Sequence, residues 1–472
     1  MAQQVLELGC GQADITPGRS TVLSGFIFRE NRPSERVYDP LCVRVLAIRY
    51  GTGITHLLVN YDVLGISQPL HEQILTSLEG AMGVDFSRTA CVLTATHTHS
   101  APPTSPLQGE DEPDPAYWQL LCDRTVEAAR QAHERLAPVS LSVASVRIPG
   151  LTYNRRAVLA DGRVSMALEP DVPVLERGPV DDTLTLLVWQ DGRARHVAAL
   201  IHFACHGVAM CEQAVASDIP GHLSNRLGKL LGVPCLFLQG AAGDVNPTAV
   251  ATGRDAMLAW VDRCAQYLQG ASDRLLPLPC TPFRTAAAEL PLHYQPLPER
   301  ATIVRNIADL ERIGRGEIDA PEVQKSVRLL AGIMNFKPGE RPDPAKAAFA
   351  AGALADAARR RLAALDTGKP LPTCPLHISL WQMGQVAFAF VAAELFALTG
   401  YRIRSLGKGQ ALLPVTYASP IVGYVPDRAA MEKGGYEVDD AWRFYRQPAP
   451  FTPDSEQRIV DTVAALVAGL QR

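Results

Sequence analysis

The first half of the chain alternates short apolar runs with amphipathic segments, and this rhythm limits the possible folds more than any other feature. Residues 43–50, 56–62 and 90–96 predict buried strands, and residues 68–81 carry Leu and Ile at helical spacing. The same patterns predict strands at 140–148, 183–190, 196–204, 235–239, 376–382 and 385–390, and helices at 115–136, 221–231, 455–470 and from 392 onward. We therefore expect an α/β fold, with a mixed β-sheet core and flanking helices.

Residues 298–366 interrupt this rhythm. Their composition turns to Ala, Arg, Glu and Leu with helical periodicity, which predicts an inserted helical segment that could cover or gate a site. The chain shows no repeats, no low-complexity tract and no convincing linker. We therefore assign residues 1–472 to one large domain.

Composition excludes several classes of partner. The formal net charge of −4 shows no basic excess that would suit nucleic acid or an anionic membrane, so a small-molecule substrate is the better expectation. The longest apolar stretch, 386–398, is interrupted by Glu394 and is too short to span a bilayer. The amino terminus shows no secretory signal, and the ten cysteines form no CxxC pair. We expect a cytoplasmic protein with reduced thiols, in which homo-oligomers remain possible.

Two histidines stand one residue apart in TATHTHSAPP, at 94–103, where a predicted strand ends. At this spacing in an extended chain, His97 and His99 point to the same side. Two converging imidazoles suit a metal ion or a proton-transfer pair. A lone HxH motif is, however, more often a pair of ordinary polar loop residues.

Further candidate ligands lie elsewhere in the chain. His206 ends another apolar strand, and zinc accepts such nitrogen donors together with oxygen donors. Glu394 lies in an apolar run, where an acid costs several kcal/mol unless it is paired or bound to metal. Its alternative role is a first-turn residue favoured by a helix dipole. Tyr424 and Tyr436, in a Gly-rich region, are either ligands or ordinary packed aromatics.

Seven short motifs occur in the order typical of the neutral/alkaline non-lysosomal ceramidases. They are GCGQADITP at 9–17, THTHSAPP at 96–103, YNRR at 153–156, HG at 206–207, GAAGDVNP at 240–247, AAE at 392–394, and YVP with GGYE at 424–437. Together the motifs span nearly the whole chain. The sequence therefore resembles this family, and the combination is far more specific than any single motif.

The resemblance implies a zinc-dependent amidase with one zinc ion per chain. Matched position by position, four residues would bind the metal: His97, His206, Glu394 and Tyr436, with Tyr424 as the alternative tyrosine. Manganese or iron could use similar donors.

The resemblance also implies roles beside the metal. His99 and Arg155 would approach the attacking water and the substrate, with His99 passing a proton to the leaving amine. Arg155 or Tyr436 would donate to the developing oxyanion. Asp244 would either orient a ligand histidine or cap its own turn.

The sequence also departs from the family pattern. Asn246 occupies the position of a family serine; it can bind substrate but cannot act as a nucleophile. A carboxyl-terminal immunoglobulin-like domain and a signal peptide are not visible. We therefore expect a small soluble N-acyl or related amide as substrate. The alternatives are a zinc-dependent ester, lactone or carbamate hydrolase, a true ceramidase, or a non-catalytic binding descendant.

Overall fold

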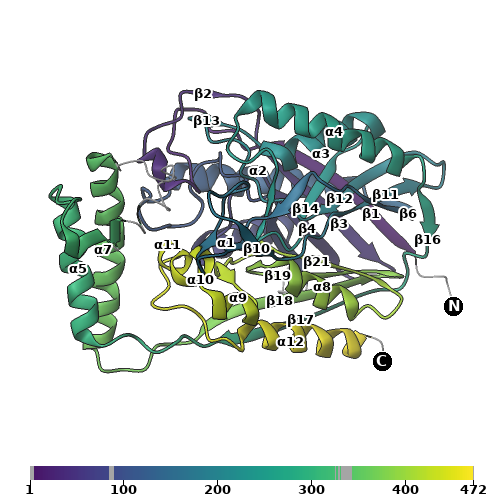
Figure 1. The fold of residues 1–472 in the computed structure, drawn as a ribbon. Helices are drawn as coiled ribbons and strands as arrows, with labels where there is room; N and C mark the ends of the chain where they lie inside the picture. Colours follow the sequence, from purple (N-terminus) through teal and green to yellow (C-terminus); the bar gives the residue numbers. More distant parts are fainter. Residues whose placement is uncertain (1–4, 84–89, 325, 328–329, 331–342, 471–472) are drawn as a thin grey trace.

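Two β-sheets packed face to face form the centre of the molecule, with helices on both outer faces (Figure 1). The computed structural model describes residues 5–83, 90–324, 326–327, 330 and 343–470. The architecture confirms the predicted α/β class with a mixed sheet.

The larger sheet has the strand order β14-β12-β11-β6-β1-β3-β4-β5, with β16 also paired to β6. In that order the bounds are Cys235–Gln239, His196–Phe203, Thr183–Asp191, Ala137–Arg147, Leu6–Asp14, Cys42–Tyr50, Thr55–Tyr61 and Cys91–Ala95, and β16 is Leu276–Leu278. The pairs β12/β14 and β4/β5 are parallel, and the other pairs are antiparallel. Both parallel pairs lie at the ends of the order.

Side chains join the two ends of this sheet. The backbone N–H of Phe237 in β14 donates to Asn60 Oδ1 in β4, at 3.2 Å. The side-chain amide of Gln239, at the end of β14, donates to the backbone carbonyls of Thr96 and Cys205, at 3.0 and 2.6 Å. The carboxyl ends of β5, β12 and β14 are therefore held close together.

The second sheet has the order β17-β18-β19-β21, with bounds Phe283–Leu292, Cys374–Met383, Val386–Val391 and Ala411–Val415. The β18–β19 hairpin turns at Gly384 and Gln385, where the two predicted strands meet. Apolar side chains of both sheets form the core between them. Helix α12 (Ser455–Leu470) packs on β17 and β18, and α8 (Ala397–Ser405) packs on β21.

Four helices cover the other face of the larger sheet: α1 (Gln68–Met82), α2 (Pro115–Glu134), α3 (Asp218–Leu231) and α4 (Arg254–Ser272). Helix α2 lies so close to β1 that a Cβ on Gly9 or Gly11 would lie 2.1 Å from a helix carbonyl oxygen. This contact explains the glycines of the GCG motif. Sequence patterning did not reveal β1, because these glycines interrupt its apolar alternation.

Residues 298–366 form the predicted helical excursion wherever the structure describes them. It contains α5 (Arg300–Gly314), the short helix η2 (Pro321–Val323) and α7 (Pro344–Asp366). The pair α5–α7 projects from the sheets beyond β17 and β18 (Figure 1). Its apolar cluster also includes Phe444, with Ile27, Phe28 and Tyr436 packed against it. The excursion therefore contacts segments from both halves of the chain.

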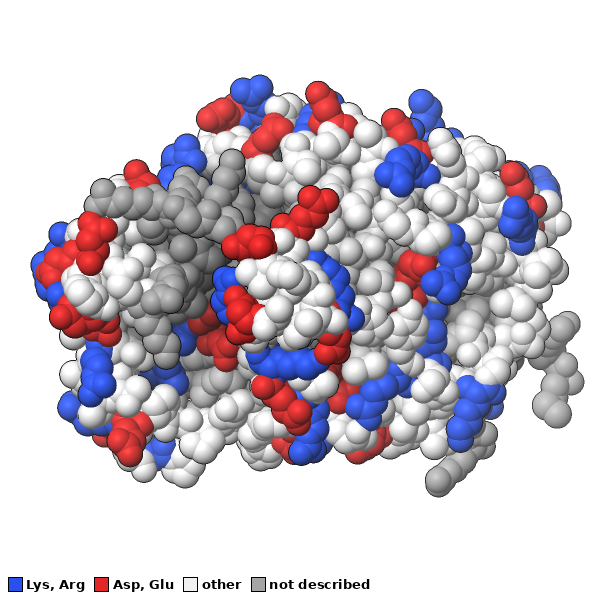
Figure 2. All heavy atoms as spheres, viewed as in Figure 1, with Lys and Arg blue, Asp and Glu red and all other residues white. Residues whose placement is uncertain are grey.

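Shorter elements complete the described chain: η1 (Ile27–Arg29), β2 (Arg36–Val37), β7 (Thr152–Asn154), β8 (Ala157–Leu159), β9 (Val164–Ser165), β10 (Val174–Arg177), β13 (Ala214–Val215), β15 (Val245–Pro247), β20 (Glu394–Leu395), β22 (Tyr424–Val425), α9 (Arg428–Lys433), α10 (Tyr436–Asp439) and α11 (Ala441–Phe444). Within the described residues, no helix is long and apolar enough to cross a membrane. Acidic and basic side chains are interspersed on the face in Figure 2.

The prediction of a helix from residue 392 onward was wrong at its start. Glu394 lies in β20, and α8 begins only at Ala397. Strand β20 pairs in parallel with β22, and Glu394 is in register with Tyr424. The glutamate is therefore not a first-turn helix residue, so a helix dipole does not explain its burial.

Candidate metal centre

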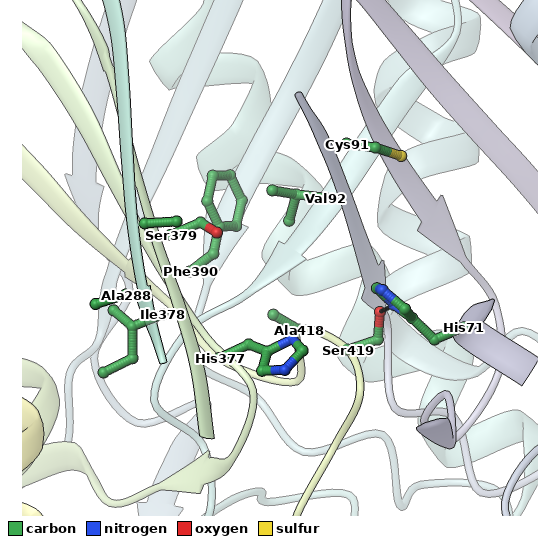
Figure 3. A pocket seen from close by; sticks show the side chains of 11 residues that line it. His71, Cys91, Val92, Ala288, His377, Ile378, Ser379, Phe390, Ala418 and Ser419 are labelled. Atoms are coloured by element: carbon green, nitrogen blue, oxygen red, sulfur yellow. Dashed lines mark hydrogen bonds between the residues drawn. The ribbon is translucent and has the colours of Figure 1, made fainter. Parts of the chain in front are cut away.

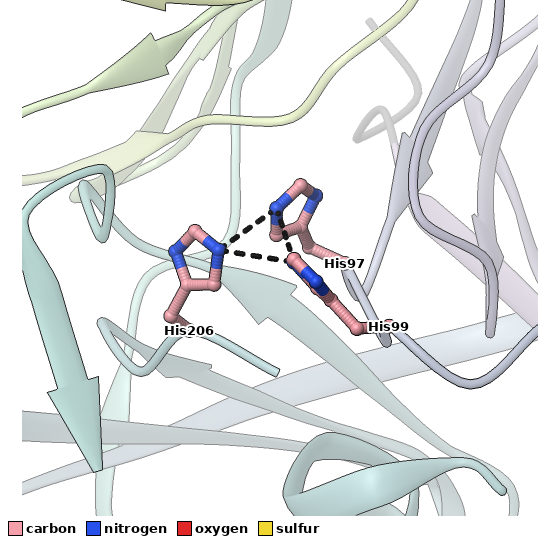
Figure 4. A group of neighbouring side chains, drawn as sticks. All are labelled: His97, His99 and His206. Atoms are coloured by element: carbon pink, nitrogen blue, oxygen red, sulfur yellow. Dashed lines mark hydrogen bonds between the residues drawn. The ribbon is translucent and has the colours of Figure 1, made fainter. Parts of the chain in front are cut away.

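Three histidines converge where β5 and β12 end (Figure 4). The Nε2 atom of His97 lies 3.2 Å from that of His99 and 3.1 Å from that of His206, and the last two are 3.1 Å apart. All three side chains are buried. Their ligand atoms lie close enough to hold one metal ion.

The other ring nitrogen of each histidine faces a backbone carbonyl. His97 Nδ1 is 2.6 Å from Leu64 O, His99 Nδ1 is 3.1 Å from Gly25 O, and His206 Nδ1 is 3.1 Å from Ala242 O. These contacts assign the proton to Nδ1, so three Nε2 lone pairs face one another. Such lone pairs repel unless a cation lies between them.

Burial keeps these imidazoles neutral. It lowers the pKa of His97 to about 3, and it lowers the pKa values of His99 and His206 well below the usual 6.5, with neighbouring positive charge contributing. Neutral imidazole is the form that binds metals. The protonation state, tautomer and direction of the three rings all suit a cation.

Glu394 adds an oxygen donor to the same point. Its Oε2 lies 3.4 Å from His97 Nε2 and, among the described residues, has no hydrogen-bond donor, although it is fully buried. Its Oε1 accepts a hydrogen bond from the Tyr445 hydroxyl. Burial raises the pKa of Glu394 to about 7, against the lowering effects of Tyr445 and Arg155. An unpartnered buried carboxylate oxygen beside three imidazoles fits a metal site.

The backbone around the histidines is strained and tightly packed. His97 has a φ of 64° and Tyr417 a φ of 59°, the left-handed region that non-glycine residues rarely adopt. The two rings lie 4.2 Å apart between centroids. A Cβ on Gly207 would lie 2.4 Å from His97 O, which explains the glycine of the HG motif. Such strain is typical of functional sites.

Four tyrosines lie near Glu394, namely Tyr417, Tyr424, Tyr436 and Tyr445, and Tyr424 is the one paired with it in backbone register. Tyr424 lies opposite Glu394 in the β20–β22 pair, and its hydroxyl accepts a hydrogen bond from Arg155 at 3.0 Å. The Tyr436 ring packs against Tyr424 and against Phe444, with 6.2 Å between centroids in each case. Tyr445 holds Glu394 directly. The backbone register therefore favours Tyr424 over Tyr436 as a neighbour of the metal position.

A short strand pair brings Arg155 and Asn246 together. In the β7–β15 pair Asn246 lies opposite Tyr153, and Arg155 Nη1 donates to Asn246 Oδ1 at 3.5 Å. Arg155 Nε donates to Glu437 at 2.8 Å. The sequence-derived candidates for substrate contact are therefore neighbours, beside Tyr424.

Glu437 holds two buried arginines at once. Its carboxylate accepts from Arg155 at 2.8 Å and from Arg156 at 2.5 Å, and its side chain is fully buried. Burial alone would raise its pKa, but the two guanidiniums outweigh this effect and leave the pKa below its ordinary value. Glu437 thus fixes the direction of Arg155.

Asp244 does not contact a ligand histidine. Its side chain accepts from the backbone N–H of Ala397 at 2.8 Å and from Asn154 Nδ2 at 2.6 Å. The alternative of orienting a ligand histidine was therefore wrong. Asp244 instead joins the start of α8, just after Glu394, to the segment that precedes Arg155.

Sequence reasoning missed four residues that support this site, two of them buried and two partly buried. Glu437 is the last residue of the quoted GGYE motif and Tyr445 lies shortly after it, but no sequence signal assigned either of them a role. Arg29 donates to His99 O and, at 3.1 Å, to Ser100 Oγ. Glu110 accepts from the Gly25 N–H at 2.7 Å, and Gly25 O in turn contacts His99. These contacts connect residues 70 or more positions apart, so no local sequence pattern predicts them.

A separate small cavity lies next to the loop that carries Tyr417 (Figure 3). His71 Nδ1 is 2.8 Å from Ser419 Oγ, and the cavity measures about 20 Å³. That volume holds about one water molecule. The cavity therefore does not offer a substrate pocket.

Residues 6–229 match the family model described as neutral/alkaline non-lysosomal ceramidase, N-terminal. The amino-terminal part of the chain is therefore similar to the neutral/alkaline ceramidases. The predicted resemblance to this ceramidase family is thus confirmed. The matched stretch contains His97, His99 and His206, whereas Glu394 and the tyrosines lie beyond it.

Two curated relatives are also ceramidases. The chain is 24% identical to a neutral ceramidase of Pseudomonas aeruginosa over 255 residues, which are 51% of this chain and 36% of the relative. It is 27% identical to a neutral ceramidase of Mycobacterium tuberculosis over 269 residues, which are 52% of this chain and 40% of the relative. The matched stretches therefore span less than half of either ceramidase.

Two solved ceramidase structures share the fold. The crystal structure of neutral ceramidase from Pseudomonas aeruginosa gives a TM-score of 0.67 at 16% identity and covers 99% of this chain and 75% of that one. A ceramidase complexed with C2 gives 0.67 at 15% identity, covering 99% and 76%. The fold of these two ceramidases therefore matches nearly the whole chain, including β20 and β22.

Proposed function

We propose that the chain is a metal-dependent hydrolase of amide bonds. One observation carries the proposal: three buried Nε2 lone pairs and an unpartnered carboxylate oxygen converge on one point. His97, His206 and Glu394 would hold the ion, and zinc suits this donor set. A bound divalent cation would lower the pKa of water and polarise a carbonyl.

The surrounding residues supply the remaining chemistry. Arg155, aimed by Glu437 and Tyr424, would donate to the negative charge that develops on the carbonyl oxygen. Asn246, beside Arg155, would hydrogen-bond the amide. His99 points its Nε2 at the metal position, so it would either bind the ion or carry a proton to the leaving amine.

The names of the relatives favour ceramide, a lipid amide, over the small soluble amide expected from the sequence. We therefore propose an N-acyl amide of the ceramide class as the substrate. Asn246 is compatible with this proposal, because a metal-activated water needs no serine nucleophile. An ester, lactone or carbamate would be attacked by the same chemistry, so the acyl linkage needs a direct test.

The proposed function predicts about one divalent ion per purified chain, measured by elemental analysis, and release of fatty acid from ceramide. A panel with ceramide, a short N-acyl amide and the matching ester separates the alternatives. Cleavage of the ester alone would make the protein an ester hydrolase. A folded protein that binds no metal and cleaves none of the panel, even when zinc is supplied, would support a binding protein instead.

The two tyrosine candidates can be distinguished by matched variants. Tyr424→Phe is expected to weaken metal binding about 10- to 100-fold, because Tyr424 is in register with Glu394 and bonds Arg155. Tyr436→Phe is expected to leave metal affinity unchanged. Isothermal titration of the metal-free proteins with zinc measures both. Weaker zinc binding in Tyr436→Phe alone would instead support Tyr436 as the ligand, as the family resemblance implies.

A further inference from the structure

A buried arginine without an acceptor lies where the helical excursion meets the rest of the molecule. The Arg361 side chain, in α7, is 8% exposed. Among the described residues its Nε is buried without a hydrogen-bond partner, and no carboxylate pairs with its guanidinium. Its Cζ lies 4.6 Å from the ring centroid of Trp442 in α11. A cation–π contact satisfies none of its N–H donors.

A second arginine contacts the same tryptophan, and two further arginines are close to this pair in the sequence. Arg443 Cζ lies 4.8 Å from the Trp442 ring centroid, so the buried indole contacts two guanidiniums. Arg446 bonds Glu112 at 2.6 Å and leaves its own Nε buried without a partner. Arg360 is exposed and donates to the side-chain amide oxygen of Gln108.

The positive charge of this group exceeds its negative charge. In the described residues, two carboxylates pair with the four arginines: Asp440 with Arg443 and Glu112 with Arg446. Burial, and then repulsion by Arg443, lowers the pKa of Arg361 to about 10. A guanidinium still remains charged at neutral pH. Arg360 is exposed, so Arg361 is the one buried arginine of the group that lacks a carboxylate, and leaving its charge unpaired is costly.

This arginine group is not part of a generally basic surface. The face shown in Figure 2 mixes both signs of charge, and the chain as a whole is negative. The group lies between α7 of the excursion and α11, which are neighbours in Figure 1. Tyr445, which holds Glu394, follows α11 directly.

We propose that this arginine group, at the contact between α7 and α11, binds a dianionic phosphate group, supplied by free phosphate or by a phosphomonoester. Guanidinium N–H groups match phosphate oxygens in geometry, and a bound anion offsets the unpaired charge of Arg361. The bound phosphate bridges Arg361 on α7 with Arg443 in α11, the two arginines that contact Trp442. It thereby fixes the excursion against the segment that carries Tyr445.

Binding is tested on the whole protein, with no substrate present. At low ionic strength, inorganic phosphate is expected to raise the Tm by about 2–3 °C at concentrations near 100 times its Kd. It is also expected to change the fluorescence of Trp442, a change absent in Trp442→Phe. Sulfate should act like phosphate and acetate much less. Glycerol 3-phosphate binding more tightly than phosphate would identify a phosphomonoester as the source.

Matched variants separate this site from a general salt effect. Arg361→Gln should lose the phosphate response and, without phosphate, be at least as stable as the wild type, because it removes an unpaired buried charge. Arg359→Gln should keep the response, since Arg359 is exposed and already paired with Glu311 and Asp356. If Arg361→Gln does not fold, Arg443→Gln takes its place. An unchanged Tm and fluorescence in phosphate, or equal loss in Arg359→Gln, would overturn the proposal.

Discussion

Replacing His206 with alanine is expected to remove the bound metal ion and to lower hydrolysis by more than about 100-fold. Changing a residue that only hydrogen-bonds a metal ligand typically costs about 10- to 100-fold, and losing the ligand itself should cost more. His206 Nε2 lies 3.1 Å from both other Nε2 atoms, so two of the three close nitrogen contacts disappear with it. Elemental analysis and zinc titration measure the first effect, and fatty acid release measures the second.

The metal-free protein provides a second readout. Metal removal is expected to lower the Tm of the wild type, since a ligand bound only to the folded state stabilises it. In His206→Ala the difference between metal-loaded and metal-free Tm should vanish. His222→Asn is a matched control, because His222 is paired with Asp39 away from the centre. A His206→Ala protein that keeps its metal and its activity would exclude His206 as a ligand.

Glu437→Gln is expected to be the most destabilising polar substitution near the site, costing about 3–5 kcal/mol of unfolding free energy. The change leaves Arg155 and Arg156 buried with no carboxylate between them. It should also reduce hydrolysis, because Arg155 loses the group that aims it. Urea unfolding at pH 7 measures the stability loss. Glu432→Gln, an exposed change in the same segment, should have little effect.

The stability difference between wild type and Glu437→Gln should depend on pH. The folded-state pKa of Glu437 lies below its ordinary value of 4.5, so its contribution is fully present above about pH 4.5. It is lost as the pH falls through the lower, folded-state pKa. The difference should therefore be constant near neutrality and shrink in acid. A difference that grows on acidification would contradict the assigned ion pairs.

Much of the fold was predictable because its strands are continuous apolar runs. The predicted strands at 43–50, 90–96 and 235–239 match β3, β5 and β14 within one residue at each end. Strand β1 was not predicted, because Gly9 and Gly11 have low strand propensity. Glycine is required at both positions by the close approach of α2. Contact with a distant helix decided those two positions.

The histidines of the site were predictable and its oxygen donors were less so. His97 and His99 share a strand end, so local spacing brings them together. Tyr424 meets Glu394 only through the β20–β22 pair, and each of these strands has two residues. Such short strands carry no periodicity. The choice between Tyr424 and Tyr436 therefore needed the three-dimensional register.

The ends of the larger sheet meet without a shared backbone ladder, through Asn60 and Gln239. His97 follows one end strand, β5, and His206 follows β12, the neighbour of the other end strand. A metal ion bound by both histidines would link two positions that are 109 residues apart in the sequence. The centre can therefore assemble only once the sheet has curled round on itself, so metal capture would mark the completion of folding.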